Sequence, residues 1–282
     1  MGDVEGARDI GSSRQPNSEL AALIQDALAI LSGSVVGFVL GLIGGGGSIL
    51  AVPLLVYVVG VNLPHVAIGT SSIAVALSAM GNLVGHARNG NVRWGYALSF
   101  AGIGSVGAAI GSSLGKTFDG HRLLILFGGL MVAVALFTLA KSAAHGSATR
   151  EIPKSTKLQR NIRLLSYGSS VGLLAGFFGI GGGFLVVPGL MASARMPLIV
   201  AIGSSLVSVA LFGLTTAANY ALSNFIDWRL AIMFVIGGMA GGILGRRAAY
   251  SLAQRKQALS QVFCAIVLSV GLYVIVRGVL SS

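Results

Sequence analysis

Long apolar segments follow one another along almost the whole chain, and they constrain its fold more than any other feature. Of the 282 residues, 54% are hydrophobic and only 10% are charged, and the mean hydropathy is +0.86. A soluble domain carries about 25% charged residues, whereas a disordered chain combines low hydrophobicity with high charge. The composition therefore excludes both classes and predicts an all-α fold, a polytopic helical membrane protein.

Ten apolar segments can be delimited, and a helix needs about 20 residues to cross a bilayer. Two segments are too short, because about 12 residues rise only about 18 Å in a helix. A third, 164–178, reaches the required length only with its flanking residues. The segments are 20–43, 48–60, 66–86, 94–115, 121–140, 164–178, 183–194, 199–222, 228–250 and 257–280, of which 48–60 and 183–194 are the short ones.

Two polar stretches frame these segments. Residues 1–19 lack the basic start and apolar core of a secretory signal, and we interpret them as a disordered N-terminal tail. Residues 141–163 carry six Lys and Arg side chains, which is typical of a cytoplasmic linker. We therefore expect two membrane units, 20–140 and 164–282, joined by this basic linker.

The second half of the chain repeats the first. Gly44–Pro53 aligns with Gly179–Pro188 at an offset of 135 residues, and Gly69–Ser71 aligns with Gly203–Ser205 at an offset of 134. A near-constant offset indicates two homologous repeats. Repeats that each contain a short, interrupted apolar segment are typical of secondary transporters whose site lies at mid-membrane.

The distribution of positive charge bears on whether the repeats are parallel or inverted. If the short segments count as spans, each half has five and the second half is inverted. Then 13 Lys and Arg lie on the cytoplasmic side against 6 outside; with four spans per half the numbers are 12 and 7. The inverted arrangement fits slightly better, and the parallel one stays open. This orientation signal also explains the net charge of +11, so no nucleic-acid partner is inferred.

The duplicated glycine motif is the main candidate for a substrate site. Consecutive glycines cost a helix roughly 1 kcal/mol each, so we expect each helix to break there, with a proline shortly after the break. Unpaired backbone cannot face lipid, so the breaks should line a cavity with N–H groups that suit an anion. Close helix packing is the alternative. The candidates are Gly44, Gly45, Gly46, Gly47, Ser48 and the helix-break residue Pro53, and Gly179, Gly181, Gly182, Gly183 and the helix-break residue Pro188.

Polar side chains in the third segment of each repeat are further candidates. They are Thr70, Ser71, Asn82, Ser204, Ser205 and Asn219. The hydroxyls could donate hydrogen bonds to an oxyanion, or they could cap a helix or bond back to it. The amides could contact substrate or join two helices. His65 and His86 lie near the two ends of the first of these segments and are interpreted as interfacial.

Several absences narrow the function. No Asp or Glu lies deep in an apolar segment, which argues against a carboxylate-based proton or cation site. The GxGxxG pattern at 102–107 lies mid-segment with no preceding strand, so no dinucleotide site is expected. The chain has no HExxH motif. We predict no metal site, no cofactor and no enzymatic activity, and a site of N–H groups, hydroxyls and amides that suits an oxyanion.

With these paired motifs the sequence resembles the TauE/SafE family, also called the sulfite exporter family, within the toluene-sulfonate uptake permease group. The resemblance covers about residues 25–280 and rests on the two glycine motifs, each followed by a Gly-hydroxyl-Ser triplet. It implies a bacterial or archaeal inner-membrane permease that moves sulfite or sulfur-containing organic anions, often outward. The family is usually described with seven or eight spans, and half-membrane segments at 48–60 and 183–194 would reconcile that number with ten segments.

Together these observations predict a secondary transporter, an exporter of small sulfur-containing oxyanions such as sulfite or sulfonates, that alternates access between its two repeats. Its partners would be the small anion and the lipid bilayer; the sequence leaves open a co-transported or exchanged ion and the oligomeric state. A passive anion channel and a membrane protein with a purely structural role are the alternatives.

Overall fold

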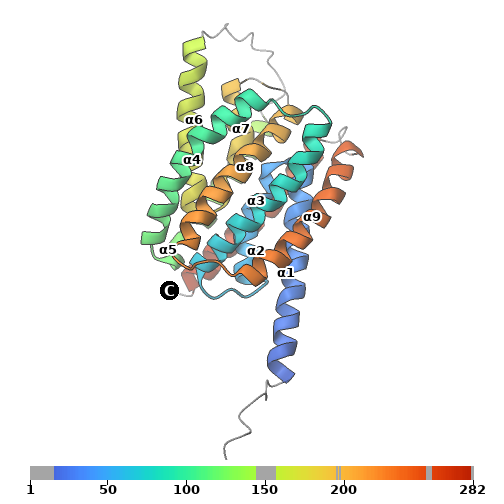
Figure 1. The fold of residues 1–282 in the computed structure, drawn as a ribbon, viewed down its shortest axis with the longest axis vertical. Coiled ribbons are helices and arrows are strands. Elements are labelled where there is room, and N and C mark those ends of the chain that lie inside the picture. Colours follow the sequence, from blue (N-terminus) through green and yellow to red (C-terminus); the bar gives the residue numbers. More distant parts are fainter. Residues whose placement is uncertain (1–15, 144–156, 195, 197, 252–255, 281–282) are drawn as a thin grey trace, which may run out of the picture.

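The fold consists of helices joined by short connections (Figure 1). The computed structural model describes residues 16–143, 157–194, 196, 198–251 and 256–280. Within these ranges there is no strand, and the helices follow the order of the predicted apolar segments. They are α1 (Pro16–Ile43), η1 (Gly45–Leu50), α2 (Ala51–Tyr57), α3 (Pro64–Arg88), α4 (Trp94–Thr117), α5 (Gly120–Ala143), α6 (Lys157–Phe178), α7 (Gly183–Ala194), α8 (Leu198–Ala221), α9 (Trp228–Ser251) and α10 (Lys256–Leu280).

Five helices are long and apolar enough to cross a membrane, judged over the described residues: α1, α3, α4, α8 and α9. The predicted crossing by 121–140 and 257–280 stays a prediction. Helices α5 and α10 have 24 and 25 residues, and their fully described stretches, Gly120–Leu136 and Cys264–Leu280, are apolar. The two segments expected to be short are short: one is formed by η1 and α2, and the other by α7. The class of a helical membrane protein is therefore confirmed.

The predicted polar stretches are partly helical. Helix α1 begins at Pro16, inside the expected 1–19 tail, and proline is favoured in the first turn because its missing N–H has no partner there. Helix α5 ends at Ala143 and α6 begins at Lys157, so both enter the expected 141–163 linker. Residues 1–15 and 144–156 lie outside the described residues.

The packing of the helices is reciprocal between the two parts of the chain. Helix α1 packs along α9, and α4 packs along α6, while α3 and α8 pack on each other between these pairs. The membrane window of α3 is 67% buried and that of α8 is 72% buried, against 44% for α1, α4 and α9. The central position of α3 and α8 makes them the helices best placed to hold a site away from lipid.

Small residues bring the outer pairs into close contact. A Cβ added to Gly37 of α1 would overlap the backbone of Gly238 in α9, and one added to Gly172 of α6 would overlap the backbone of Gly104 in α4. Backbones of membrane helices approach closely where side chains are absent. Most of the glycines on these helices therefore have a packing role.

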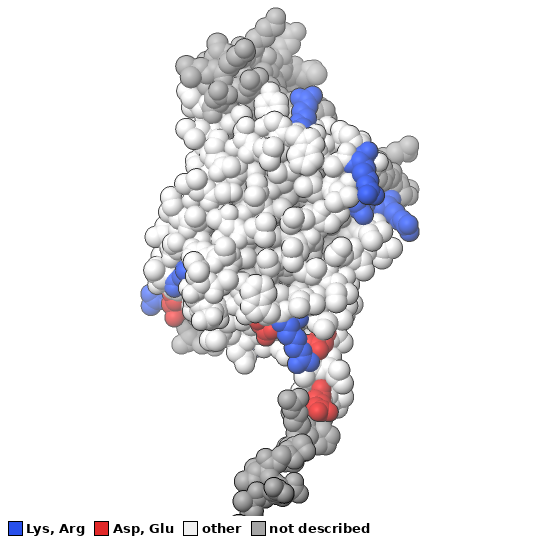
Figure 2. All heavy atoms as spheres, in the orientation of Figure 1, with Lys and Arg blue, Asp and Glu red and all other residues white. Residues whose placement is uncertain are grey.

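Charged side chains gather at the two ends of the bundle (Figure 2). One end, here called the acidic end, holds the start of α1 and the loops before α5 and α9; the described acidic residues Glu19, Asp26, Asp119 and Asp227 lie there. The opposite, basic end holds the loop between α3 and α4 and the end of α9, with Arg88, Arg93, Arg246 and Arg247.

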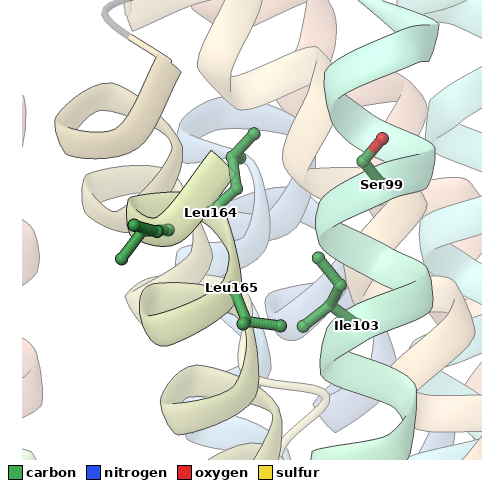
Figure 3. A pocket seen from close by; sticks show the side chains of 5 residues that line it. Ser99, Ile103, Leu164 and Leu165 are labelled. Carbon is green, nitrogen blue, oxygen red and sulfur yellow. The ribbon is translucent and has the colours of Figure 1, made fainter. Parts of the chain in front are cut away.

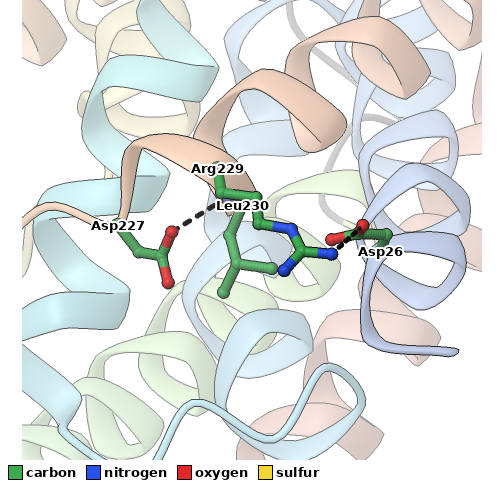
Figure 4. Close-up of polar contacts among 4 residues, drawn as sticks. All are labelled: Asp26, Asp227, Arg229 and Leu230. Carbon is green, nitrogen blue, oxygen red and sulfur yellow. Dashed lines mark hydrogen bonds and ion pairs between the residues drawn. The ribbon is translucent and has the colours of Figure 1, made fainter. Parts of the chain in front are cut away.

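At the acidic end an ion pair and a helix cap tie α9 in place (Figure 4). The Arg229 guanidinium lies 2.6 Å from a carboxylate oxygen of Asp26 in α1. The carboxylate of Asp227 accepts a hydrogen bond of 3.0 Å from the N–H of Leu230 in the first turn of α9. Such a cap satisfies an N–H that has no partner within the helix.

Candidate functional site

Both glycine motifs interrupt the helices. Helix α1 ends at Ile43, Gly44 has a φ of +78°, and η1 begins at Gly45. After α6, the φ angles of Gly179, Gly181 and Gly182 are +66°, +63° and +66°, and α7 then begins at Gly183. A positive φ is freely available only to glycine, so these turns require the motif.

The two prolines lie within the short helices rather than at the breaks. Pro53 is the third residue of α2, in the first turn, as expected for a proline near a helix start. Pro188 is the sixth residue of α7 and lies in its second turn. The breaks are therefore made by the glycines alone.

The two breaks meet at the centre of the bundle. Gly45 and Gly183 lie backbone against backbone, and a Cβ on either residue would overlap the other. Gly46 and Gly47 are buried as well, and the buried Ser48 hydroxyl donates a hydrogen bond of 2.8 Å to the carbonyl of Gly45. In this conformation the contact leaves no room for an anion between Gly45 and Gly183. The predicted donor role of the N–H groups stays a prediction.

The surroundings of the breaks are reciprocal. Gly44 lies against the side chain of Ile202 in α8, and Gly179 lies against that of Ile68 in α3. Gly47 and Gly182 also pack in corresponding ways, each against the helix that precedes its own break. A Cβ on Gly47 would approach the backbone of α1, and one on Gly182 would lie 2.6 Å from the Cβ of Ala175 in α6. A large side chain at Gly47 would thus disturb packing whatever its effect on a ligand.

The Gly-hydroxyl-Ser triplets dock the start of each central helix onto a distant loop. Gly69 lies against the backbone of Phe225, and Gly203 lies against that of Asn91. In both places the absent side chain lets the helix start approach the loop that precedes α9 or α4. The triplet glycines therefore serve a contact between parts of the chain that are far apart in sequence.

The hydroxyls of these triplets have structural partners. Thr70 accepts a hydrogen bond of 2.9 Å from the N–H of Asp227, and Ser204 accepts one of 3.0 Å from the N–H of Arg93. Both N–H groups belong to the residue just before a long helix. Each hydroxyl therefore holds the backbone at the start of another long helix, and its contact with substrate stays a prediction.

The following serines bond back to their own helices. Ser71 donates to the carbonyl of Ile68 at 2.9 Å, and Ser205 donates to that of Ile202 at 2.7 Å. Such bonds to the preceding turn are common for serine in helices. A contact between these hydroxyls and substrate stays a prediction.

The two asparagines differ. The amide of Asn219 joins α8 to α4 through hydrogen bonds to Ser112 at 2.7 Å and Ser113 at 2.9 Å. Its side-chain oxygen accepts a bond of 2.7 Å from Lys116. The sequence left open whether this residue binds substrate or another helix, and the geometry favours the helix.

Asn82 is buried in α3 and only partly bonded. Its amide nitrogen donates to the carbonyl of Ser78 at 3.0 Å, but its side-chain oxygen has no partner among the described residues. Gly242 of α9 lies opposite and offers no side chain. The side-chain oxygen of this buried amide thus has unused hydrogen-bonding capacity.

A shared feature of α3 and α8 could not be assigned from the sequence. Among the described residues, every buried side-chain nitrogen or oxygen without a hydrogen-bond partner belongs to one of these two central helices. The residues are His65, Ser78, Asn82 and His86 in α3, and Ser208, Thr216 and Tyr220 in α8. Buried polar groups normally find partners, so their concentration on two helices calls for an explanation. The sequence offers one signal for this feature: Ser78, Asn82 and His86 are spaced by four residues and so share one face of α3.

A pocket of about 410 Å³ lies elsewhere, between α4 and α6 (Figure 3). Apolar side chains and Ser99 line it, and none of the predicted site residues does. An apolar groove between membrane helices suits lipid rather than an anion. Within the described residues there is also no group of three His, Cys, Asp or Glu side chains that could hold a metal ion.

The fold and these buried contacts define a helical membrane protein, and comparison with known proteins makes it a membrane transporter. The family model described as sulfite exporter TauE/SafE matches residues 29–274. The chain therefore belongs to the TauE/SafE family, as the resemblance in its sequence implied. No solved structure matches the chain.

Curated relatives cover most of the chain. A probable membrane transporter protein of Xylella fastidiosa is 50% identical over 255 residues, which are 89% of this chain and 95% of the relative. The probable membrane transporter protein YunE of Bacillus subtilis is 28% identical over 272 residues, 90% of this chain and 98% of the relative. The probable membrane transporter protein MJ0441 of Methanocaldococcus jannaschii is 28% identical over 212 residues, 73% of this chain and 76% of the relative. All three are named as transporters rather than enzymes.

Proposed function

We propose that the protein is a secondary transporter in the inner membrane that exports a small sulfur-containing oxyanion, such as sulfite or a sulfonate. The observation that carries the proposal is the match of residues 29–274 to the sulfite exporter family. The chemistry agrees with an anion: the described acidic side chains lie at one end of the bundle and not at its centre. A carrier of protons or metal cations commonly needs an intramembrane carboxylate.

We further propose that the chain is built of two inverted repeats, 20–140 and 164–282. Three reciprocal contacts support this division. Helix α1 packs on α9 as α6 packs on α4, Gly45 meets Gly183, and the bond from Asp227 to Thr70 has its counterpart in the bond from Arg93 to Ser204. The basic end, where α6 begins, is then cytoplasmic.

Transport would proceed by alternating access, with the two repeats rocking around the glycine breaks. The breaks are suited to this role because η1 and α7 both begin at the contact, and the first N–H groups of a helix lack partners within it. Separation of Gly45 from Gly183 would expose these N–H groups to an anion. The conformation in which Gly45 touches Gly183 would then be the state of the transport cycle in which these N–H groups are closed to the anion.

The proposal is tested with full-length protein in proteoliposomes that are preloaded with unlabelled sulfite and given labelled sulfite outside. A carrier accumulates label by exchange and saturates with concentration. A passive channel shows neither trans-stimulation nor saturation. No sulfite or sulfonate flux above empty vesicles would contradict a transport function for these anions and favour a structural role.

Binding is measured separately by thermal unfolding of the purified protein with sulfite, sulfate, thiosulfate, a sulfonate, acetate and chloride. An anion at about 100 times its dissociation constant adds roughly 2.7 kcal/mol to the stability of the folded state. We expect such a shift with sulfite or a sulfonate and none with chloride. Equal shifts with all anions would indicate an ionic-strength effect.

A further inference from the structure

We propose that four residues at the contact of α3 with α9 form the binding path through which a protonated oxyanion enters from the basic end. They are Ser78, Asn82, His86 and Arg246, here called the polar stripe. The inference rests on the proposed transport of a sulfur oxyanion and adds which residues receive it and which form of the anion they select.

The stripe is a line of buried polar groups on one face of α3. Ser78, Asn82 and His86 are spaced by four residues and are 1%, 2% and 3% exposed. Residues four apart lie above one another on a helix, and eight residues cover about 12 Å. The three side chains thus reach from the basic end well into the bundle.

These groups have unused hydrogen-bonding capacity. The Ser78 hydroxyl, the side-chain oxygen of Asn82 and both ring nitrogens of His86 have no partner among the described residues. The facing helix cannot supply one, because α9 places Gly238 opposite Ser78 and Gly242 opposite Asn82. Burying polar groups without partners is costly, so a ligand that supplies them gives the arrangement a reason.

A cation stands at the outer end of the stripe. The guanidinium of Arg246 lies over the backbone of Gly85, next to His86 in sequence, and it is half-buried. Within the described part of the chain it has neither an ion pair nor a hydrogen bond. An unpaired guanidinium beside buried polar groups attracts an oxyanion and can bind it with two parallel hydrogen bonds.

The equivalent contact of α8 with α4 differs in its cation and not in its unpartnered groups. At an offset of 134 residues, Asn82 and His86 correspond to Thr216 and Tyr220, whose buried hydroxyls also have no partner among the described residues. At the same offset, Ser78 corresponds to Phe212, which packs on Gly104.

The cation of this second contact, Lys116, already donates to the carbonyl and side-chain oxygens of Asn219 and to Ser223, at 2.7–3.0 Å. An ammonium has three donors, and all of them are used. Of the two contacts, only that of α3 with α9 therefore offers an anion a free cation among the described residues.

The stripe also predicts the form of the anion. Arg246 and Ser78 can donate, neutral His86 offers one donor and one acceptor, and the oxygen of Asn82 can only accept. A ligand that satisfies all of them must both accept and donate hydrogen bonds. Hydrogensulfite does so, whereas sulfate at neutral pH only accepts. The inner end of the stripe lies one turn from Val75, whose side chain would be 3.5 Å from a Cβ on Gly181 of the second break.

The test compares sulfite transport by Arg246→Gln and Arg247→Gln in proteoliposomes. Arg247 is the exposed neighbour, so its variant removes the same charge from the same end of α9. We expect Arg246→Gln to raise the KM for sulfite at least tenfold and Arg247→Gln to change it less than twofold. Sulfate should compete at least tenfold more weakly than sulfite.

A third variant, Asn82→Leu, separates a binding role from a structural one. It replaces a buried amide by an apolar group of similar size, so we expect an unchanged or higher melting temperature together with at least tenfold slower transport. If this variant fails to fold, the Arg246 and Arg247 pair decides alone.

Unchanged KM in Arg246→Gln, with wild-type transport intact, would overturn the stripe and leave the proposed function standing. Equal competition by sulfate would overturn the selection of a protonated anion. Absence of sulfite transport by the wild-type protein would overturn the proposed function and the stripe together.

Discussion

The contact of α3 with α9 and the contact of α8 with α4 share their backbone geometry but differ in chemistry. In both, a glycine of the outer helix receives a side chain from the central helix: Ser78 at Gly238 in one, Phe212 at Gly104 in the other. Both contacts continue with unpartnered polar groups, Asn82 and His86 in the first and Thr216 and Tyr220 in the second. They differ in the cation: Arg246 has no hydrogen bond or ion pair among the described residues, whereas Lys116 donates to Asn219 and Ser223. The difference teaches that helix packing is repeated in this chain whereas the free cation is not.

The largest effect is expected at the contact of Gly45 with Gly183, to which both parts of the chain contribute equally. Gly45→Leu and Gly183→Leu each force a side chain into the opposing backbone, and we expect both to prevent accumulation of folded protein. Gly129→Ala in α5 is the control, because nothing lies within 4 Å of its added Cβ; a gain of up to about 1 kcal/mol is expected. Detergent-solubilised yield and thermal unfolding measure these outcomes. Folded, stable protein from only one leucine variant would break the reciprocity.

The second prediction concerns the paired positions at the two contacts. Phe212→Ala should lower the free energy of unfolding by about 3–5 kcal/mol, because it removes a fully buried aromatic ring. Ser78→Ala removes a hydroxyl without a partner and should leave the free energy of unfolding unchanged or raise it slightly. Thermal or denaturant unfolding compares the two. Similar losses would mean that Ser78 has a structural partner after all.

The third prediction tests the reciprocal caps. Thr70→Val and Ser204→Ala each remove the acceptor for a loop N–H, that of Asp227 or that of Arg93, and should each cost about 1–3 kcal/mol. Ser71→Ala loses only a bond to its own helix and should cost less. Melting temperature and transport are measured on the same preparations. Transport lost without any loss of stability would instead assign these hydroxyls to the substrate.

The smallest effect lies at the acidic end, outside both contacts. The backbone N–H of Arg122 and, less strongly, that of His121 lower the pKa of Asp119, which is exposed in the loop before α5. A lowered pKa in the folded state stabilises the protein above the unfolded-state pKa, and the contribution is lost as pH falls through the folded value. Asp119→Asn should therefore show a slightly weaker loss of stability in the acid range. If the melting temperatures of the wild-type protein and the variant depend on pH identically, the hydrogen bonds to the Asp119 carboxylate do not stabilise the fold.

The sequence by itself determined the class of protein, the order of the helices and the positions of the breaks. Apolar length, glycine content and the repeated offset act locally, so 48–60 and 183–194 were predictable as short segments and Gly44 and Gly179 as breakpoints. The boundaries were less predictable: α1 extends back to Pro16, and α6 begins at Lys157. These helices continue beyond their apolar segments into polar residues at the membrane surface. The end of an apolar segment therefore does not mark the end of the helix.

Only the tertiary structure decided which polar groups are used and which remain free. The sequence treated Asn82 and Asn219 alike, yet Asn219 meets Ser112 and Ser113 of α4, while Asn82 faces a glycine of α9. It also treated the triplet hydroxyls as possible donors, whereas Thr70 meets a loop N–H more than 150 residues away. A hydrogen-bond partner depends on which helix packs opposite. That pairing is fixed by close approach between distant glycines and not by the local sequence around either residue.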